Sequence, residues 1–252
     1  MIHHKVEQNS EQWFRLRLGI PTASEFKRIL TPTGKLSAQA ATYAHRLLAE
    51  WIIGAPLEEE PASAWMVRGT ELQDAAVSAY EFLAGVETEP GGFFTTDDGW
   101  AGASPDRLIG ADGILEIKCP APQTHVGHML TGKLDREHWP QLQGQLWVAE
   151  RQWTEIVSYH PLFPAVIIRV PRDDAYIRDL EASIQAFVLT LQQAREVLEN
   201  QYGPFTRAEP KEVPPTDEFG ISDEDLDLLL REKFPTTIVV PGSADRLLSP
   251  DD

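Results

Sequence analysis

The spacing of apolar residues changes along the chain, and this change limits the fold class most strongly. Up to about residue 85 apolar side chains recur at intervals of three and four, which is typical of helices, and from residue 86 they alternate. Alternation predicts strands, because successive side chains of a strand point to opposite faces. We therefore expect an α/β fold in which a helical N-terminal part precedes a central mixed β-sheet flanked by helices.

Turn and capping residues divide these regions into elements. Helices are expected over 10–18, 22–30, 37–53 and 63–83, and again over 137–150. The second helix should begin at a capping box formed by Thr22 and Glu25. Strands are expected over 88–96, 100–109, 113–119, 153–160 and 165–171. Apolar residues then step by three and four from Ile177 to Leu198, which predicts a long helix that ends at Gly203.

Composition separates the last fifty residues from the rest. Residues 1–203 are expected to form one domain, with a helical part over 1–85 and the sheet and long helix over 86–203. Residues 204–252 hold twelve acidic and five basic residues with several prolines, which predicts an acidic C-terminal extension. This extension is too short for its own core, so it is either disordered or docked on another surface.

The sequence lacks the marks of a secreted or membrane protein. Its first residues do not show the basic-then-apolar layout of a signal peptide, and no apolar run approaches the roughly 18 residues that cross a bilayer. Cys119 is the single cysteine, which excludes an internal disulfide and a cysteine-rich metal site. We expect a soluble cytoplasmic protein with no membrane partner.

The charge distribution is more informative than the net charge of −17. An acidic chain repels DNA, because phosphate binding depends on Lys and Arg. Residues 1–50, however, hold seven basic and four acidic residues and carry +3, whereas residues 51–203 carry −13 and residues 204–252 carry −7. If the protein binds DNA, the N-terminal part should supply the cationic surface.

One expected hairpin carries three charged residues that apolar strands do not need. It reads SPDRLIGADGILEIKCP (104–120) and contains Asp106, Glu116 and Lys118. Glu116 and Lys118 lie two residues apart, so they project from the same face of the second strand. Taken alone, such a pair is usually a solvated face of a sheet. An Asp followed ten residues later by Glu-x-Lys within a hairpin is more specific.

The position of Asp106 depends on the register of that hairpin. If Ala111, Asp112 and Gly113 form a three-residue loop, Gly110 pairs with Ile114 and Asp106 lies opposite Lys118, on the Glu116 face. A two-residue loop would turn Asp106 to the opposite face. Two adjacent carboxylates repel each other unless a cation lies between them, and Mg²⁺ prefers such oxygen ligands. The trio therefore suits metal-assisted phosphodiester hydrolysis, with the lysine as electrostatic partner.

The trio resembles the PD-(D/E)xK nuclease motif, and the surrounding sequence resembles the lambda exonuclease group, also called YqaJ-type viral recombinases. The resemblance spans roughly residues 10–200, with its motifs in order. Five stretches carry it: WFRLRLGIPTASEF (13–26), RGTELQDAA (68–76), GASPDRL (102–108), LEIKCP (115–120) and WPQLQGQLWV (139–148). It implies a restriction-endonuclease-like core within residues 1–203.

The resemblance also implies roles for the hairpin residues. In that family the residues matching Asp106 and Glu116 bind Mg²⁺, for which Mn²⁺ is an alternative. The backbone carbonyl of the residue matching Ile117 is a further ligand, and the lysine matching Lys118 assists the attacking water.

Four more residues gain a role from the resemblance. Glu71 matches an acidic residue near the metals, and Gln141 matches a glutamine close to the catalytic centre. Arg17 and Ser24 match residues that bind the 5′-phosphate of a DNA end, which agrees with the basic N-terminal part. Without the family, Glu71 could be a surface acid, Gln141 could solvate a helix, and Arg17 could pair with Glu11 or Glu25.

The activity implied is a Mg²⁺-dependent 5′-to-3′ exodeoxyribonuclease that acts on double-stranded DNA ends and releases 5′-mononucleotides. Members of the family form a homotrimer ring and work with a single-strand annealing protein in phage recombination. The alternatives are a PD-(D/E)xK endonuclease and a catalytically silent DNA-binding adaptor. A zinc site built from His125, His128 and His138 has less support.

Overall fold

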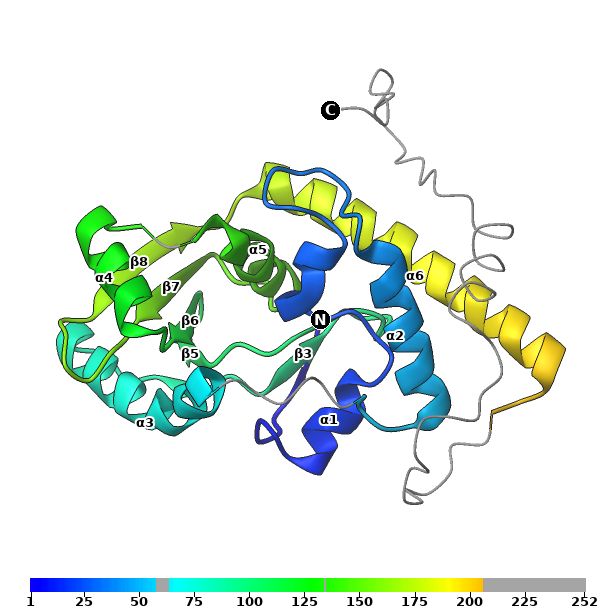
Figure 1. Cartoon of the computed structure of the whole chain (residues 1–252), viewed down its shortest axis with the longest axis horizontal. Coiled ribbons are helices and arrows are strands. Elements are labelled where there is room, and N and C mark those ends of the chain that lie inside the picture. The colour runs from blue at the N-terminus through cyan, green and yellow to red at the C-terminus, as the bar shows by residue number, and fades with distance from the viewer. Residues whose placement is uncertain (58–63, 134, 206–252) are drawn as a thin grey trace.

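The computed structural model describes residues 1–57, 64–133 and 135–205, with only the backbone of residues 64–71 (Figure 1). Its helices are α1 (Glu11–Arg17), α2 (Ala40–Ile53), α3 (Ala64–Ala84), α4 (Pro122–Thr131), α5 (Trp139–Val148) and α6 (Asp174–Tyr202), with 3₁₀ helices η1 (Ala23–Arg28) and η2 (Arg136–His138). Its strands are β1 (Ile2–His4), β2 (Glu89–Pro90), β3 (Phe93–Thr95), β4 (Gly102–Ala103), β5 (Arg107–Ile109), β6 (Gly113–Lys118), β7 (Trp153–Ser158) and β8 (Val166–Pro171). Nearly all of the expected acidic extension lies outside the described residues.

The main sheet has five strands in the order β2-β5-β6-β7-β8. Strands β6 and β7 are parallel, and the other neighbours are antiparallel. The parallel step needs a crossover, which α4, η2 and α5 supply between the two strands. The expected α/β class with a mixed sheet is therefore confirmed.

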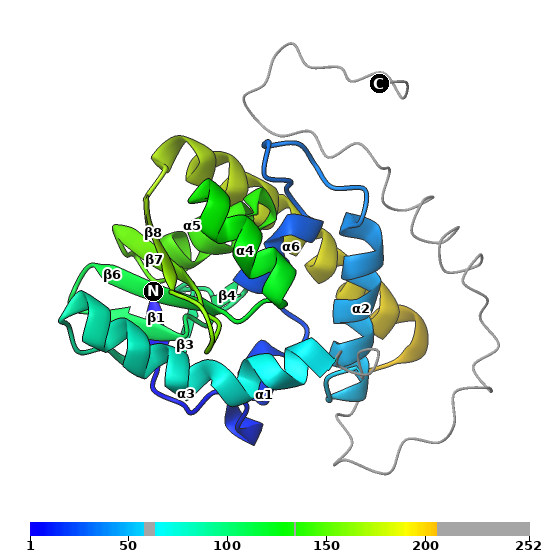
Figure 2. The same ribbon diagram turned by 60° about the vertical axis from the view of Figure 1, so that its left-hand side comes forward.

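Helices cover both faces of this sheet (Figures 1 and 2). On one face, Ala76 and Tyr80 of α3 pack against Leu115 and Ile117 of β6. On the other face, Ile114 of β6 belongs to the larger core, to which α2, α5 and α6 also contribute. The alternation along β6 thus directs Leu115 and Ile117 toward α3, and leaves Ile114, Glu116 and Lys118 for the α5 side.

Two expected strands are each divided between two sheets. Residues 88–96 contain β2 and β3, and residues 100–109 contain β4 and β5. Strand β3 pairs with β1 and β4 in a separate three-stranded sheet. The division occurs where Gly91 approaches Pro105 so closely that a Cβ on Gly91 would lie 1.8 Å from the Pro105 carbonyl oxygen. This break lets the chain leave the ladder just before Asp106.

The N-terminal helices lie near their expected positions, but the capping box is wrong. Ser10 caps α1 by accepting a hydrogen bond from the Trp13 backbone N–H. Thr22 precedes η1 without capping it through its side chain, and Glu25 pairs with Arg28 instead. A 3₁₀ helix forms here because the segment is held by tertiary contacts rather than by its own cap.

A glycine brings η1 against the sheet-covering helix α5. A Cβ on Gly144 would lie 2.4 Å from the ring of Phe26, so only glycine allows this approach. Phe26 itself is fully buried. The contact places the N-terminal part directly beside the helix that covers the α5 face of β6.

The long helix α6 confirms its apolar stripe, because Ile177, Leu180, Ile184 and Leu191 are all buried. Asp173 caps its start, and the helix ends at Gly203 as expected. Helix α2 begins three residues later than expected, and neither β1 nor α4 was predicted. Within the described residues, every helix is too short or too polar to span a bilayer.

Candidate active site

The hairpin register differs from the expected one, because each residue of β5 pairs with a residue of β6 two positions earlier than expected. Ile109 pairs with Gly113, and Arg107 with Leu115, so the loop is formed by residues 110–112. Gly110 belongs to this loop because its φ of 53° is left-handed, which favours glycine. Gly113 is a strand residue, where a Cβ would meet the Trp153 ring at 2.4 Å.

This shift changes the partner of Asp106 but not the parity of the register. Continuing the observed pairs beyond Arg107 and Leu115 places Asp106 level with Glu116 rather than with Lys118. Asp106 lies just outside β5, after the break at Pro105. Its Oδ2 accepts a hydrogen bond of 2.6 Å from the Ile117 N–H, and its Oδ1 accepts one of 3.0 Å from Gln73 of α3. The start of β5 thus brings Asp106 against the C-terminal end of β6.

Glu116 is the centre of a buried hydrogen-bond network. Only 3% of it is exposed. Its Oε1 accepts hydrogen bonds from Lys118 Nζ at 2.7 Å and from Gln141 Nε2 at 2.6 Å. Its Oε2 accepts one from Gln145 Nε2 at 2.7 Å. Lys118 also donates to Gln141 Oε1 at 3.2 Å, so strand β6 and helix α5 build this network together.

The pKa shifts show that a second negative charge is unfavourable here. Burial and, next in size, the nearby Glu116 carboxylate raise the pKa of Asp106 to about 8, although the hydrogen bond from the Ile117 N–H works against both. Burial alone would lower the pKa of Lys118, but the charge of Glu116 and its hydrogen bond outweigh burial and raise this pKa. Lys118 therefore compensates the Glu116 carboxylate, and burial together with that neighbouring carboxylate disfavours ionisation of Asp106.

These residues fit a divalent cation. Carboxylate oxygens are the ligands that Mg²⁺ prefers, and one or two of them are its usual protein ligands. A cation between Asp106 and Glu116 would also relieve the repulsion that raises the pKa of Asp106. Lys118 lies beside the Glu116 carboxylate, which keeps the lysine protonated.

Some functional candidates were not found from the sequence. Gln73 and Gln145 contact Asp106 and Glu116 directly, yet glutamines on helices carry no signal of their own. Both occur inside motifs that carried the resemblance, Gln73 two residues after Glu71 and Gln145 four after Gln141. The backbone of Glu71 belongs to α3, but its side chain lies outside the described residues.

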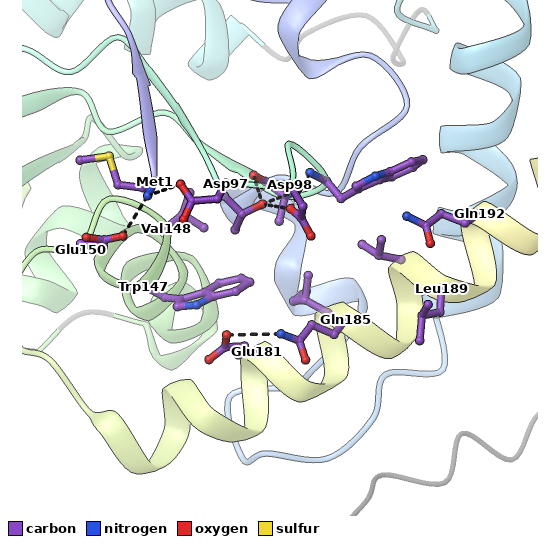
Figure 3. Close-up of a pocket in the computed structure, with 15 residues that line it drawn as sticks. Met1, Asp97, Asp98, Trp147, Val148, Glu150, Glu181, Gln185, Leu189 and Gln192 are labelled. Carbon is purple, nitrogen blue, oxygen red and sulfur yellow. Dashed lines mark hydrogen bonds and ion pairs between the residues drawn. The ribbon is translucent and has the colours of Figure 1, made fainter.

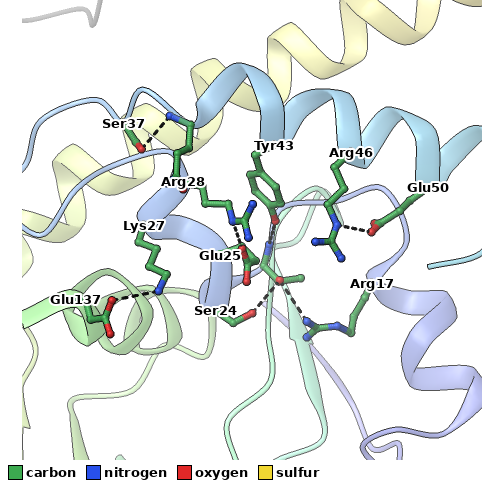
Figure 4. Close-up of polar contacts among 12 residues, drawn as sticks. Arg17, Ser24, Glu25, Lys27, Arg28, Ser37, Tyr43, Arg46, Glu50 and Glu137 are labelled. Carbon is green, nitrogen blue, oxygen red and sulfur yellow. Dashed lines mark hydrogen bonds and ion pairs between the residues drawn. The ribbon is translucent and has the colours of Figure 1, made fainter. Parts of the chain in front are cut away.

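Arg17 and Ser24 come together across the junction of α1 and η1 (Figure 4). Arg17 Nη2 lies 3.5 Å from Thr22 Oγ1, which in turn lies 3.3 Å from Ser24 Oγ. The Arg17 guanidinium stacks over Trp13 at 4.1 Å. The two acids considered as its partners are engaged elsewhere, Glu11 with Arg15 and Glu25 with Arg28.

A cavity of about 340 Å³ opens beside Arg17. Arg46 and Thr22 also line it, and so do Glu25 and Glu50, which pair with Arg28 and Arg46. A small anion there would meet two guanidinium groups and two carboxylates that are already paired. Trp13, which also lines this cavity, donates its Nε1–H to Ser104 Oγ at 2.8 Å, and Ser104 precedes Asp106 by two residues in the chain.

The histidines considered for zinc are placed differently. His125 and His128 both direct Nδ1 at the hydroxyl of Ser158, at 2.8 and 2.9 Å. His138 instead joins Asp135 and Glu137, and one ligand atom from each lies within 4.8 Å of the others. This exposed group is a second location where a metal could bind.

A second cavity, of about 580 Å³, lies elsewhere, between the β3–β4 turn, the end of α5 and α6 (Figure 3). Asp97, Asp98, Glu150 and Glu181 line it. These four carboxylates would repel phosphate groups. The cavity is therefore poorly suited to a nucleic acid, and none of the predicted site residues lines it.

The fold and the site define the class of protein. A mixed five-stranded sheet flanked by helices, with Asp106 just before β5 and with Glu116 and Lys118 on β6, corresponds to the PD-(D/E)xK nuclease fold. The YqaJ-like viral recombinase domain matches residues 12–152, which is more than half of the chain. The chain belongs to this family, and the resemblance seen in the sequence is confirmed.

Solved structures agree with this assignment. The alkaline exonuclease LHK-Exo from Laribacter hongkongensis is 33% identical, with a TM-score of 0.70, and the match covers 76% of this chain and 97% of that one. LHK-Exo in complex with dAMP matches with a TM-score of 0.69 over the same shares at the same identity. A phage-related exonuclease from Haemophilus somnus 129PT shares the fold, at 13% identity and a TM-score of 0.57, over 71% of this chain and 96% of that one. No curated protein matches the chain.

Proposed function

We propose that the protein is a Mg²⁺-dependent 5′-to-3′ exodeoxyribonuclease. It degrades one strand of duplex DNA from 5′-phosphorylated ends, releases 5′-mononucleotides and leaves a 3′ single strand for phage-type recombination. The observation that carries this proposal is the network in which Glu116 binds Lys118 and Gln141 beside the buried Asp106. The complex of the related LHK-Exo with dAMP, a deoxynucleoside monophosphate, is consistent with such a product.

Each residue has a distinct part in the proposed reaction. Asp106 and Glu116 would hold the cation, with the Ile117 carbonyl as a further ligand and Glu71 nearby, and Mn²⁺ would be able to replace Mg²⁺. When bound, the ion supplies Lewis-acid activation of the phosphate and of a water molecule. Lys118 orients that water and stabilises negative charge on the phosphoryl oxygen. Gln141 keeps Lys118 and Glu116 in place through hydrogen bonds to both.

The wider biological role follows from family membership. We propose that residues 1–203 form the nuclease domain and that residues 204–252 are an acidic extension. Three copies form a ring, in which the basic residues 1–50 face the DNA and offset the charge of an acidic chain. The protein works with a single-strand annealing protein, in the cytoplasm of a bacterium that carries the phage or prophage.

Digestion of defined DNA substrates tests the proposed activity. We expect linear duplex with 5′-phosphates to be degraded with Mg²⁺ but not with EDTA, and covalently closed circles to stay intact. Chromatography should show 5′-mononucleotides. Cleavage of the circles would indicate an endonuclease instead. Loss of nucleotides from 3′ ends only would reject a 5′-to-3′ exonuclease. Tight DNA binding without degradation would favour a catalytically silent adaptor.

Replacement of Arg17 by glutamine should remove the preference for phosphorylated ends. A hydrogen bond to a charged group contributes about 1.5–3 kcal/mol, so the preference should fall by about ten- to a hundredfold. The measurement is the ratio of initial rates on duplexes with and without a 5′-phosphate. Arg15→Gln is the matched control, because Arg15 is exposed and pairs with Glu11. An unchanged ratio in the Arg17 variant would exclude Arg17 from phosphate recognition.

A further inference from the structure

Helix α5 presents two glutamines to the same carboxylate. Gln141 and Gln145 lie four residues apart, so they project from one side of the helix. Gln141 donates to Oε1 of Glu116 at 2.6 Å, and Gln145 donates to Oε2 at 2.7 Å. Gln145 is only 1% exposed, and its contact with Glu116 excludes solvent. Family resemblance gave a role to Gln141 alone.

The two oxygens of Glu116 are not equally occupied. A carboxylate oxygen offers two lone pairs. Oε1 accepts from both Lys118 and Gln141, which fills it, whereas among the described residues Oε2 accepts from Gln145 alone. Oε2 therefore keeps one lone pair for a cation, and the direction of that lone pair is set by Gln145.

Gln145 also occupies its position at a cost to the fold. Its Oε1 is buried and has no hydrogen-bond partner among the described residues. A buried amide oxygen without a partner is unfavourable, and an apolar side chain of the same size would avoid this penalty. The hydrogen bond that the Gln145 amide nitrogen donates to Glu116 therefore explains a glutamine at this position better than packing does.

We infer that Gln145 is a positioning residue, which holds Oε2 of Glu116 in the orientation needed to bind the divalent cation. The inference rests on the metal site of the proposed function. Hydrogen bonds that orient metal ligands typically change metal affinity by about 10- to 100-fold when they are removed. Gln145 should therefore act on metal affinity, whereas Lys118 should act on the rate with metal bound.

The same helix offers a matched control. Gln143 is fully buried, like Gln145, but it donates to the Pro171 carbonyl at 3.0 Å and accepts from the Asp173 N–H at 2.8 Å. These contacts fasten α5 to the turn before α6 and do not reach the carboxylates. Methionine has a size close to glutamine and no donor, so the same substitution at both positions separates metal binding from stability.

The experiment compares Gln145→Met and Gln143→Met in the full-length chain. Titration calorimetry with MnCl₂, without DNA, should show a Kd about tenfold higher for Gln145→Met and a Kd within about twofold of wild type for Gln143→Met. Thermal denaturation should show the larger drop in Tm for Gln143→Met. In digestion assays, Gln145→Met should need about tenfold more Mg²⁺ for half-maximal rate and approach the wild-type rate when Mg²⁺ is saturating.

A second variant keeps the test decisive if Gln145→Met does not fold. Gln145→Asn keeps the amide but withdraws it by one methylene, so it should weaken Mn²⁺ binding in the same direction. An unchanged Kd in the folded Gln145 variant, or an equal rise in the Gln143 variant, would overturn the inference. If wild type binds Mn²⁺ and Gln145→Met weakens it, but duplex DNA is not degraded, the proposed function fails and this inference stands.

Discussion

Replacement of Lys118 by methionine will lower kcat by about 10²- to 10⁴-fold, the range typical of a side chain that acts in the transition state. The Lys118 ammonium donates to both Glu116 and Gln141, at 2.7 and 3.2 Å. Removing it takes away the charge that would stabilise the phosphoryl oxygen. The substrate contacts proposed for the N-terminal part would remain, so DNA affinity should change little.

The measurement is single-turnover digestion of a labelled duplex at saturating Mg²⁺, with DNA affinity determined in parallel. Lys133→Met is the control, because Lys133 is exposed and lies outside the basic residues 1–50. A Lys118 variant that digests DNA within about threefold of wild type would remove Lys118 from the mechanism.

Replacement of Asp106 by asparagine should abolish metal binding and reduce activity by about 10²-fold or more, because a metal contributes several kcal/mol to such a reaction. Asparagine can still accept from the Ile117 N–H, so the fold should remain. Without metal, its Tm should equal or exceed that of wild type, because wild type must either bury a charge on Asp106 beside Glu116 or protonate that carboxylate, and asparagine avoids both costs. Mg²⁺ should raise the Tm of wild type but not of the variant.

The measurement is thermal denaturation of wild type and of the Asp106 variant, each without Mg²⁺ and with Mg²⁺ at about 10 mM, a concentration that would fill a weak site. Asp112→Asn is the matched control, because Asp112 is exposed in the loop of the same hairpin. A Tm rise of equal size in wild type and in the Asp106 variant would place the ion elsewhere.

The sequence predicted those parts of the site that depend on local pattern. Alternation placed Glu116 and Lys118 on one face of a strand, and the structure confirms that both meet Gln141. The long apolar stripe of α6 was equally clear, because a helical spacing of apolar residues that continues for about twenty residues fits no other secondary structure. Basic residues clustered near Arg17, and that region does contain a cavity lined by two arginines.

Features that depend on tertiary contacts were missed or misplaced. The hairpin register was wrong because Gly110 and Gly113 both suit a turn, and only Trp153 on the neighbouring strand decides between them. Two strands were predicted where four exist, because alternation continues across the break at Gly91. Gln145 could not be identified, since its importance comes from the crossing of α5 over β6.

Diffraction from crystals soaked in MnCl₂ tests the central claim most directly, because the anomalous scattering of Mn²⁺ locates the ion without assuming its ligands. The account predicts a peak between the carboxylates of Asp106 and Glu116, within bonding distance of both. A map with no peak there, or with manganese only at Asp135, Glu137 and His138, would contradict it.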